Sequence, residues 1–198
     1  MNGILMATRM EAKPFIESKN FNLIEDNPFP VYKHLMNYLI ISGIGKINAG
    51  IASAYLMTKF QIDSMYNIGS AGAATEKFMI GDILHINSVI DYSQLLNTKS
   101  ESKSLKPDIF SNYKTESLAT CDVPIISAEE RAMVAHKASL IDMEAFAFVH
   151  ACRMFNKKNY LFKIITDTPG NVNADEIILN IRKTRGLLYQ FFMDAMGL

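Results

Sequence analysis

The sequence predicts an α/β fold with a largely parallel sheet, and three observations support this prediction. Short apolar runs of strand length alternate with longer segments whose apolar residues recur at helical spacing. The run at residues 83–90 is mostly apolar without strict alternation, which is typical of a strand covered on both faces. The chain of 198 residues, 49% of them hydrophobic, can bury a full core, and no linker divides it. We therefore expect a single domain over residues 1–198.

The first part of the chain contains two pairs of a strand and a helix. Residues 3–7 form a short apolar strand, and Pro14 then falls near the start of a helix, where its missing N–H matters least. A second strand at residues 38–41 ends in a turn with two glycines, residues 42–45. Residues 47–60 follow with an apolar stripe at helical spacing.

The rest of the chain continues this alternation. A third strand at residues 65–68 enters a turn of small residues at 69–72, before the strand at 83–90. Residues 97–117 are rich in Ser, Lys and Asn, so we expect an exposed loop or a mobile flap there. The remaining expected elements are a helix through 129–136, a strand at 140–143 with a buried helix after it, a strand at 160–165, and a long helix from about residue 173.

Charge and hydropathy narrow the class of partner. Basic residues and acidic residues each number 20, so no net field would draw the chain to nucleic acid or to an acidic membrane surface. The partner is therefore expected to be a small molecule or a protein. The first residues have no basic region and no cleavage pattern, and no stretch approaches the roughly 18 apolar residues of a membrane span. We expect a cytoplasmic protein.

Cysteine and histidine usage does not indicate a metal centre. Cys152 lies in a buried helical pattern, so reduced core thiols are favoured over a disulfide with Cys121. The histidines show no metal-ligand spacing; they are His34, His85, His136 and His150. We expect no metal.

One carboxylate lies in an unusually apolar stretch. Glu144 falls within SLIDMEAFAFVHACR, residues 139–153, where a charge costs several kcal/mol unless it is paired or hydrogen-bonded. Its position is the junction of a sheet edge and a helix start, which is where ligands bind in open α/β sheets. A helix N-terminus also tolerates negative charge. A carboxylate that only caps its own helix remains the alternative.

Two further carboxylates share this setting. Glu11 follows the first expected strand and Asp167 follows the strand at 160–165, so both lie with Glu144 at carboxyl ends of strands. Two separated carboxylates are the minimum for acid and base chemistry at a glycosidic carbon, and a third can hold sugar hydroxyls. Taken singly, Glu11 could be an acidic residue in the first turn of a helix with no functional role, and Asp167 could be a residue that favours a turn.

The glycine-containing segments do not indicate a nucleotide cofactor. SGIGKINAG and NIGSAGAA both allow close approach of the backbone to a ligand, but neither is a P-loop. The first lacks the third spaced glycine of a dinucleotide fingerprint, so we expect no nicotinamide cofactor. Lys46 and Lys163 could neutralise an anion, although solvated lysines are the commoner case.

Five stretches of the sequence occur in the order that is found in one known family, and this order makes them more specific together than any one alone. They are GILMATRMEAKPF, SGIGKINAGIASAYL, IGSAGAA with GDILHINSVID after it, IDMEAFAFVHACRMF, and ITDTPG. With them the chain resembles the nucleoside phosphorylase and nucleosidase superfamily, most closely the 5'-methylthioadenosine/S-adenosylhomocysteine nucleosidases. The resemblance covers most of the chain. It implies a single α/β domain around a mixed, partly barrel-like sheet, a homodimer, and no cofactor.

The resemblance also implies roles for the carboxylates. Glu11 matches the general base that activates water, and Asp167 matches the acid that protonates the imidazole nitrogen of the purine. Glu144, with the backbone of Met143, matches the group that holds the ribose hydroxyls. Buried carboxylates would stabilise the oxocarbenium character that develops on the sugar. The other positions expected to contact substrate are Ile125, Pro124, Thr166, Ser70, Asn67 and Gly45.

Hydrolysis and phosphorolysis divide this superfamily. The phosphorylases grip phosphate with two arginines, and this chain has Glu11 and Asn67 at those places. A carboxylate there repels phosphate and suits water, although Arg9 lies nearby and could still serve. The sequence therefore favours a nucleosidase, with a nucleoside phosphorylase as an alternative.

The walls of the expected pocket depart from the nucleosidase pattern. Pro124 stands where an aromatic residue usually stacks on the base, and Ala174 where an aromatic residue covers the 5' substituent. Lys163 replaces an arginine near the ribose. We expect a purine nucleosidase acting on a 5'-modified nucleoside such as methylthioadenosine or adenosylhomocysteine, with a futalosine-type nucleoside still open. A nucleoside-binding protein with little catalysis is the alternative from a different class.

Overall fold

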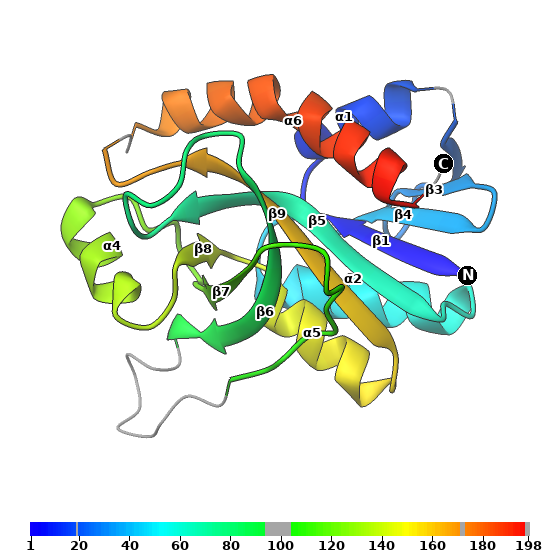
Figure 1. Ribbon diagram of the computed structural model, residues 1–198. Coiled ribbons are helices and arrows are strands. Elements are labelled where there is room, and N and C mark those ends of the chain that lie inside the picture. Colours follow the sequence, from blue (N-terminus) through cyan, green and yellow to red (C-terminus); the bar gives the residue numbers. More distant parts are fainter. Residues whose placement is uncertain (19, 94–103, 171–172, 197–198) are drawn as a thin grey trace.

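A mixed sheet of nine strands forms the centre of the computed structural model (Figure 1). The structure describes the chain except residues 19, 94–103, 171–172 and 197–198. The strands are β1 (Asn2–Met6), β2 (Asn22–Glu25), β3 (Val31–His34), β4 (Asn37–Ile41), β5 (Ser64–Ala73), β6 (Ile83–Asp91), β7 (Thr115–Thr120), β8 (Leu140–Asp142) and β9 (Lys158–Asp167). Their order in the sheet is β2-β3-β4-β1-β5-β8-β7-β6-β9.

Half of this sheet closes into a barrel. The first residues of β5 pair in parallel with β1, and its last residues, Gly72 and Ala73, pair with β8 on the side that β1 has left. β9 runs parallel to β5 and antiparallel to β6, while β7 joins β6 to β8. The strands β5, β8, β7, β6 and β9 therefore form a closed ring, and β1, β4, β3 and β2 extend from β5. The expected mixed, partly barrel-like sheet is confirmed.

Helices cover both faces of the sheet. Helices α1 (Arg9–Glu17) and α6 (Ala174–Met196) pack together on one face, and α2 (Lys46–Lys59) and α5 (Ala145–Met154) pack together on the other (Figure 1). The short helix α4 (Ala128–Ala135) lies beyond the end of the barrel near β8. No helix in the described part of the chain is long and apolar enough to span a membrane.

The core has two layers because the central strands are buried on both faces. In β1, Leu5 faces the cluster beneath α2 and α5, whereas Ile4 and Met6 face the cluster beneath α1 and α6. All three side chains have no solvent exposure. This double burial is why such strands appear in the sequence as continuous apolar runs rather than as alternating ones.

Three details differ from the sequence prediction. The small residues 69–72, expected to form a turn, lie inside β5. Part of the expected loop at 97–117 is ordered structure, since Leu105 is buried and bridges to Val89, and residues 115–117 belong to β7; residues 97–103 lie outside the described residues. The strands β2 and β3 were not predicted, because they form an edge hairpin whose β2 residues are largely exposed.

Pro14 also departs from its expected position near a helix start. It lies inside α1, where it cannot donate the hydrogen bond that the carbonyl of Met10 would normally accept. The guanidinium of Arg185, in α6, donates to that carbonyl instead, at 3.0 Å. The proline therefore destabilises α1 less than it would destabilise an isolated helix, and the bond from Arg185 links α1 to α6.

Candidate functional site

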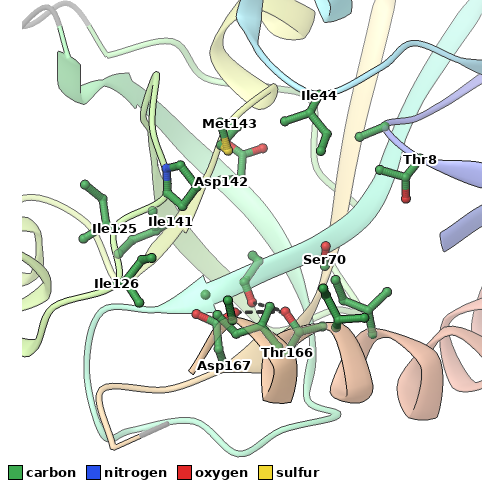
Figure 2. A pocket seen from close by; sticks show the side chains of 18 of the residues that line it. Thr8, Ile44, Ser70, Ile125, Ile126, Ile141, Asp142, Met143, Thr166 and Asp167 are labelled. Carbon is green, nitrogen blue, oxygen red and sulfur yellow. Dashed lines mark hydrogen bonds between the residues drawn. The ribbon is translucent and has the colours of Figure 1, made fainter. Parts of the chain in front are cut away.

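A cavity of about 450 Å³ opens where the carboxyl ends of β5, β8 and β9 meet the first turn of α1 and one side of α6. Its polar lining consists of Thr8, Glu11, Ser70, Arg131, Asp142, Glu144, Thr166 and Asp167. Its larger apolar lining residues are Met10, Ile44, Val123, Pro124, Ile125, Ile126, Ile141, Met143, Ile177, Ile178 and Ile181. None of the described lining residues is aromatic. Figure 2 shows Ile125, Ile126 and Ile141 on one side, with Ser70, Thr166 and Asp167 on another.

Glu11 is held by four hydrogen bonds at the start of α1. Its Oε2 accepts from the N–H and the hydroxyl of Thr8, at 3.1 and 2.8 Å, which forms a capping box with that residue. Its Oε1 accepts from the N–H and the hydroxyl of Ser70, at 2.8 and 2.6 Å. The carboxylate is buried, and it links the beginning of the helix to the middle of β5.

The glycines of β5 allow two carboxylates to approach the strand. A Cβ atom at Gly69 would lie 3.1 Å from Oε1 of Glu11, and one at Gly72 would lie 2.6 Å from Oδ2 of Asp167. A side chain at position 72 would therefore displace Asp167. At about 3.3 Å of rise per residue, these two glycines are about 10 Å apart along the strand. The spacing leaves room for a small ligand between Glu11 and Asp167.

Asp167 ends β9 and pairs with Arg131 from α4. The guanidinium of Arg131 donates through Nη2 to Oδ2 of Asp167 and through Nη1 to the carbonyl of Ala73, the latter at 2.9 Å. Thr166 donates its hydroxyl to Oδ1 of Asp167 at 3.0 Å. Asn180, in α6, donates to the carbonyl of Thr166 at 3.0 Å and so ties this strand end to the helix.

A buried ion pair lies beneath the pocket. Nζ of Lys163 is 2.9 Å from Oδ2 of Asp142, and both side chains are almost fully buried. Asp142 also accepts from the hydroxyl of Thr120 at 2.8 Å and from the N–H of Ala145 at 2.9 Å. Burial alone would lower the pKa of Lys163, but Asp142 and Glu144 outweigh it and raise that pKa above its ordinary value.

Glu144 does not cap its own helix, so the capping alternative is wrong. The residue precedes α5 without a side-chain cap bond, and Asp142 accepts from the first N–H of that helix. Oε1 of Glu144 accepts instead from the N–H of Gly45, at 2.8 Å. Burial and the nearby Asp142 raise the pKa of Glu144 to about 7, against the opposing effects of Lys163 and the Gly45 N–H.

The structure brings most of the residues expected at the site to this one cavity. The lining includes Glu11, Asp167, Met143, Glu144, Ile125, Pro124, Thr166 and Ser70. Gly45 is not among the lining residues, but its N–H binds Glu144. Asn67 lies buried outside the lining, where its amide donates to the carbonyl of Leu5 at 3.3 Å. Ala174 also lines the cavity.

Three polar residues of the cavity were not anticipated, namely Thr8, Arg131 and Asp142. Arg131 lies in a segment with two preceding glutamates, which has the appearance of a solvated helix face, yet its side chain is 2% exposed. Asp142 stands two residues before Glu144 in the same apolar stretch, and that context was an available signal. Arg9 turns away from the cavity, since its guanidinium donates to Tyr32 at 3.0 Å and to Asp26 at 3.2 Å.

Comparisons with known proteins agree with this fold. The sequence pattern of the phosphorylase superfamily matches residues 3–111. A 5'-methylthioadenosine/S-adenosylhomocysteine nucleosidase of Buchnera aphidicola is 26% identical over 201 residues, which cover 87% of this chain and 79% of that protein.

Two solved structures from Helicobacter pylori share the fold. One is a 5'-methylthioadenosine/S-adenosylhomocysteine nucleosidase in complex with a pyrrolidine ligand, and the other is a futalosine hydrolase. Each has a TM-score of 0.86 and 17% identity, and each match covers 99% of this chain and 97% of the other. Because both match equally well, the fold does not distinguish between their substrates.

Proposed function

The chain belongs to the phosphorylase superfamily, and from that membership we propose that it is a purine nucleosidase. The reaction would hydrolyse the N-glycosidic bond of a 5'-modified nucleoside, of the methylthioadenosine or adenosylhomocysteine kind, to a free base and a sugar. The observation that carries this proposal is the convergence of Glu11, Glu144 and Asp167 on one cavity lined mostly by apolar side chains.

The three carboxylates divide the chemistry between them. Glu11 accepts a proton from a water molecule, whose oxygen then bonds to the anomeric carbon of the sugar. Asp167, protonated on Oδ1 with the Thr166 hydroxyl then donating to the carbonyl of Ala71, donates to the imidazole nitrogen of the base. The bond between the anomeric carbon and the base breaks with its electron pair leaving on the base. Glu11 returns its proton to solvent, and Asp167 regains one, so both are restored for the next turnover.

Glu144 is suited to hold the sugar. Its carboxyl group lies in the lining and has one oxygen fixed by the N–H of Gly45. With a pKa of about 7, it is present in both protonation states near neutral pH, so it can accept a hydrogen bond from a ribose hydroxyl or donate one to it. In its charged form, it also stabilises the positive charge that develops on the sugar.

Water is a better nucleophile than phosphate for this cavity. Phosphate in place of the attacking water would meet the carboxylates of Glu11 and Glu144, while Lys163 is paired with Asp142 and Arg131 is bonded to Asp167 and not to Glu11. Arg9, the arginine closest in sequence to Glu11, is bonded to Tyr32 and Asp26 outside the cavity. We therefore favour hydrolysis over phosphorolysis.

Two further features belong to the proposal. We propose a homodimer, with an exposed apolar stripe on and before α2, formed by Ile44, Ile47 and Ile51, as part of its interface. Sedimentation of the purified protein tests this, and a monomer at micromolar concentration contradicts it. We also propose that the enzyme works in the cytoplasm, and its two cysteines, Cys121 and Cys152, are buried and free.

A panel of nucleosides tests the activity. The purified protein is incubated with adenosine, methylthioadenosine, adenosylhomocysteine, inosine and futalosine, with and without phosphate, and free base is measured by chromatography. Release of base without phosphate supports the proposed nucleosidase. Release that requires phosphate identifies a phosphorylase, and binding without release identifies a nucleoside-binding protein; either result contradicts the proposal.

A further inference from the structure

One wall of the cavity carries a buried guanidinium that the proposed reaction does not use. Arg131 reaches from α4 into the lining and is 2% exposed. Two of its nitrogens bond to Ala73 and Asp167, whereas its Nε has no partner among the described residues. A guanidinium has five N–H donors and no acceptor. The cavity wall beside Asp167 is therefore rich in donors.

The acceptors beside this guanidinium are already engaged. Oδ2 of Asp167 takes the bond from Arg131, and Oδ1 takes the hydroxyl of Thr166 at 3.0 Å. The Nε has no exposed surface for a ligand to contact, but Nη1 and Nη2 each carry a second N–H, so a ligand that offers an acceptor to Arg131 gains a hydrogen bond. A ligand that offers another donor at the same place gains nothing and faces a cation.

Purine bases differ in the hydrogen-bond donors and acceptors that they present on the edge that carries the imidazole nitrogen. A 6-aminopurine presents one acceptor and one donor there, whereas a 6-oxopurine presents two acceptors. Because Asp167 takes the imidazole nitrogen, the 6-substituent is what distinguishes the two bases for Arg131. A 6-oxo group accepts a hydrogen bond from a guanidinium, whereas a 6-amino group presents a donor, which a guanidinium cannot accept and a Gln or Asn side chain can. A base whose imidazole nitrogen meets Asp167 has its 6-substituent within reach of the guanidinium bonded to that carboxylate.

We propose that Arg131 makes this site select nucleosides of 6-oxopurines over those of 6-aminopurines. The inference rests on the proposed nucleosidase function, keeps the 5'-modified sugar, and makes the 6-oxo counterparts of the adenosine compounds the preferred substrates. Under this inference, the base preference of this chain differs from that of the relatives whose names contain adenosine. The preference is assigned to a residue of α4 whose side chain reaches the end of β9. Arg131 is then the residue that determines specificity, and Asp167 remains the acid.

Two nucleosides that differ only at position 6 test this inference. The kcat/KM of the wild-type protein is measured for 5'-methylthioinosine and for 5'-methylthioadenosine in the same buffer. We expect the inosine compound to be preferred by about tenfold or more, the scale of discrimination by a well-placed base contact. Equal values, or a preference for the adenosine compound, overturn the inference and leave the nucleosidase function standing. Failure to cleave any nucleoside of the panel, with or without phosphate, contradicts the proposed function itself.

A substitution tests whether Arg131 is the residue that produces the preference for 6-oxopurines. Arg131→Gln replaces two donors with one donor and one acceptor, so the ratio of the two kcat/KM values should move about tenfold or more toward the adenosine compound. Arg153→Gln is the matched control, because Arg153 also donates to a main-chain carbonyl, that of Lys106, but lies exposed and outside the cavity lining. A purely structural role for Arg131 would lower both values together, and an unchanged ratio overturns the assignment.

A binding measurement covers the case in which the Arg131→Gln protein does not fold. Calorimetry of the wild-type protein with hypoxanthine and with adenine compares the two base classes without any variant. Tighter binding of hypoxanthine supports the inference, and equal or tighter binding of adenine overturns it.

Discussion

Replacement of the buried lysine beneath the cavity should destabilise the protein strongly. Lys163 is 1% exposed, and its Nζ lies 2.9 Å from Oδ2 of Asp142. The substitution Lys163→Met keeps the unbranched apolar stem and removes the charge. Asp142 would then remain a buried carboxylate without a counter-ion, although it would keep its hydrogen bonds from Thr120 and Ala145.

The expected cost follows from this arrangement. Removing one partner of a buried ion pair costs about 3–5 kcal/mol. Because two hydrogen bonds to Asp142 survive, we expect the lower end, about 3 kcal/mol. For a chain of this length, that corresponds to a fall in Tm of roughly 6–12 °C. The pKa of Glu144 should rise above its value of about 7, since Lys163 is one of the groups that hold it down.

Urea unfolding followed by circular dichroism at pH 7.5 measures the effect. Lys158→Met is the matched control, because Lys158 is exposed at the start of the same strand, β9, and its replacement should change the free energy of unfolding by less than about 0.5 kcal/mol. Adding Asp142→Asn to Lys163→Met should recover part of the loss, because it removes the unpaired charge. A loss below about 1 kcal/mol for Lys163→Met would refute the account of the ion pair.

Three further outcomes are expected. Asp167→Asn should lower kcat for base release by about 100-fold to 10,000-fold while the protein still folds by circular dichroism, and near-normal turnover would remove Asp167 as the acid. Arg9→Ala should leave base release almost unchanged, because Arg9 bonds outside the cavity; a large loss would indicate a role in binding the nucleophile. Burial lowers the pKa of His85, whose neutral ring is bonded to the carbonyl of Leu161 and the N–H of Phe110. Only the unfolded state then takes up a proton as the pH falls below about 6.5, so the free energy of unfolding should fall with pH there, and His85→Gln should reduce that dependence. An equal fall in the free energy of unfolding between pH 7.5 and pH 5.0 for the wild-type and His85→Gln proteins, measured by urea unfolding, would contradict this.

The sequence was sufficient to predict much of this fold and the carboxylates of its cavity. The apolar runs predict the buried strands, because strands covered on both faces leave an apolar signature without alternation, as in β1. Glu11, Glu144 and Asp167 could be grouped because each follows a predicted strand, and strand ends meet at one edge of a sheet.

Features that depend on long-range contacts could not be predicted in this way. Arg131 has polar neighbours in the sequence and is buried only because α4 packs against the ends of β5 and β9. Lys163 carries a charge within an apolar strand, which resembles the signal that identified Glu144, but its partner, Asp142, lies on another strand. The glycines at positions 69 and 72 suggested a turn, whereas they keep a strand clear of side chains so that two carboxylates can approach it.

The central claim is that Glu11 activates water at this cavity. The most direct measurement is the rate of base release by Glu11→Gln in phosphate-free buffer, on the best substrate of the panel, with Glu17→Gln on the exposed side of the same helix as control. Our account predicts a loss of at least about 100-fold for Glu11→Gln with nucleoside binding retained, and a normal rate for Glu17→Gln. A rate for Glu11→Gln within a few-fold of wild type would contradict it.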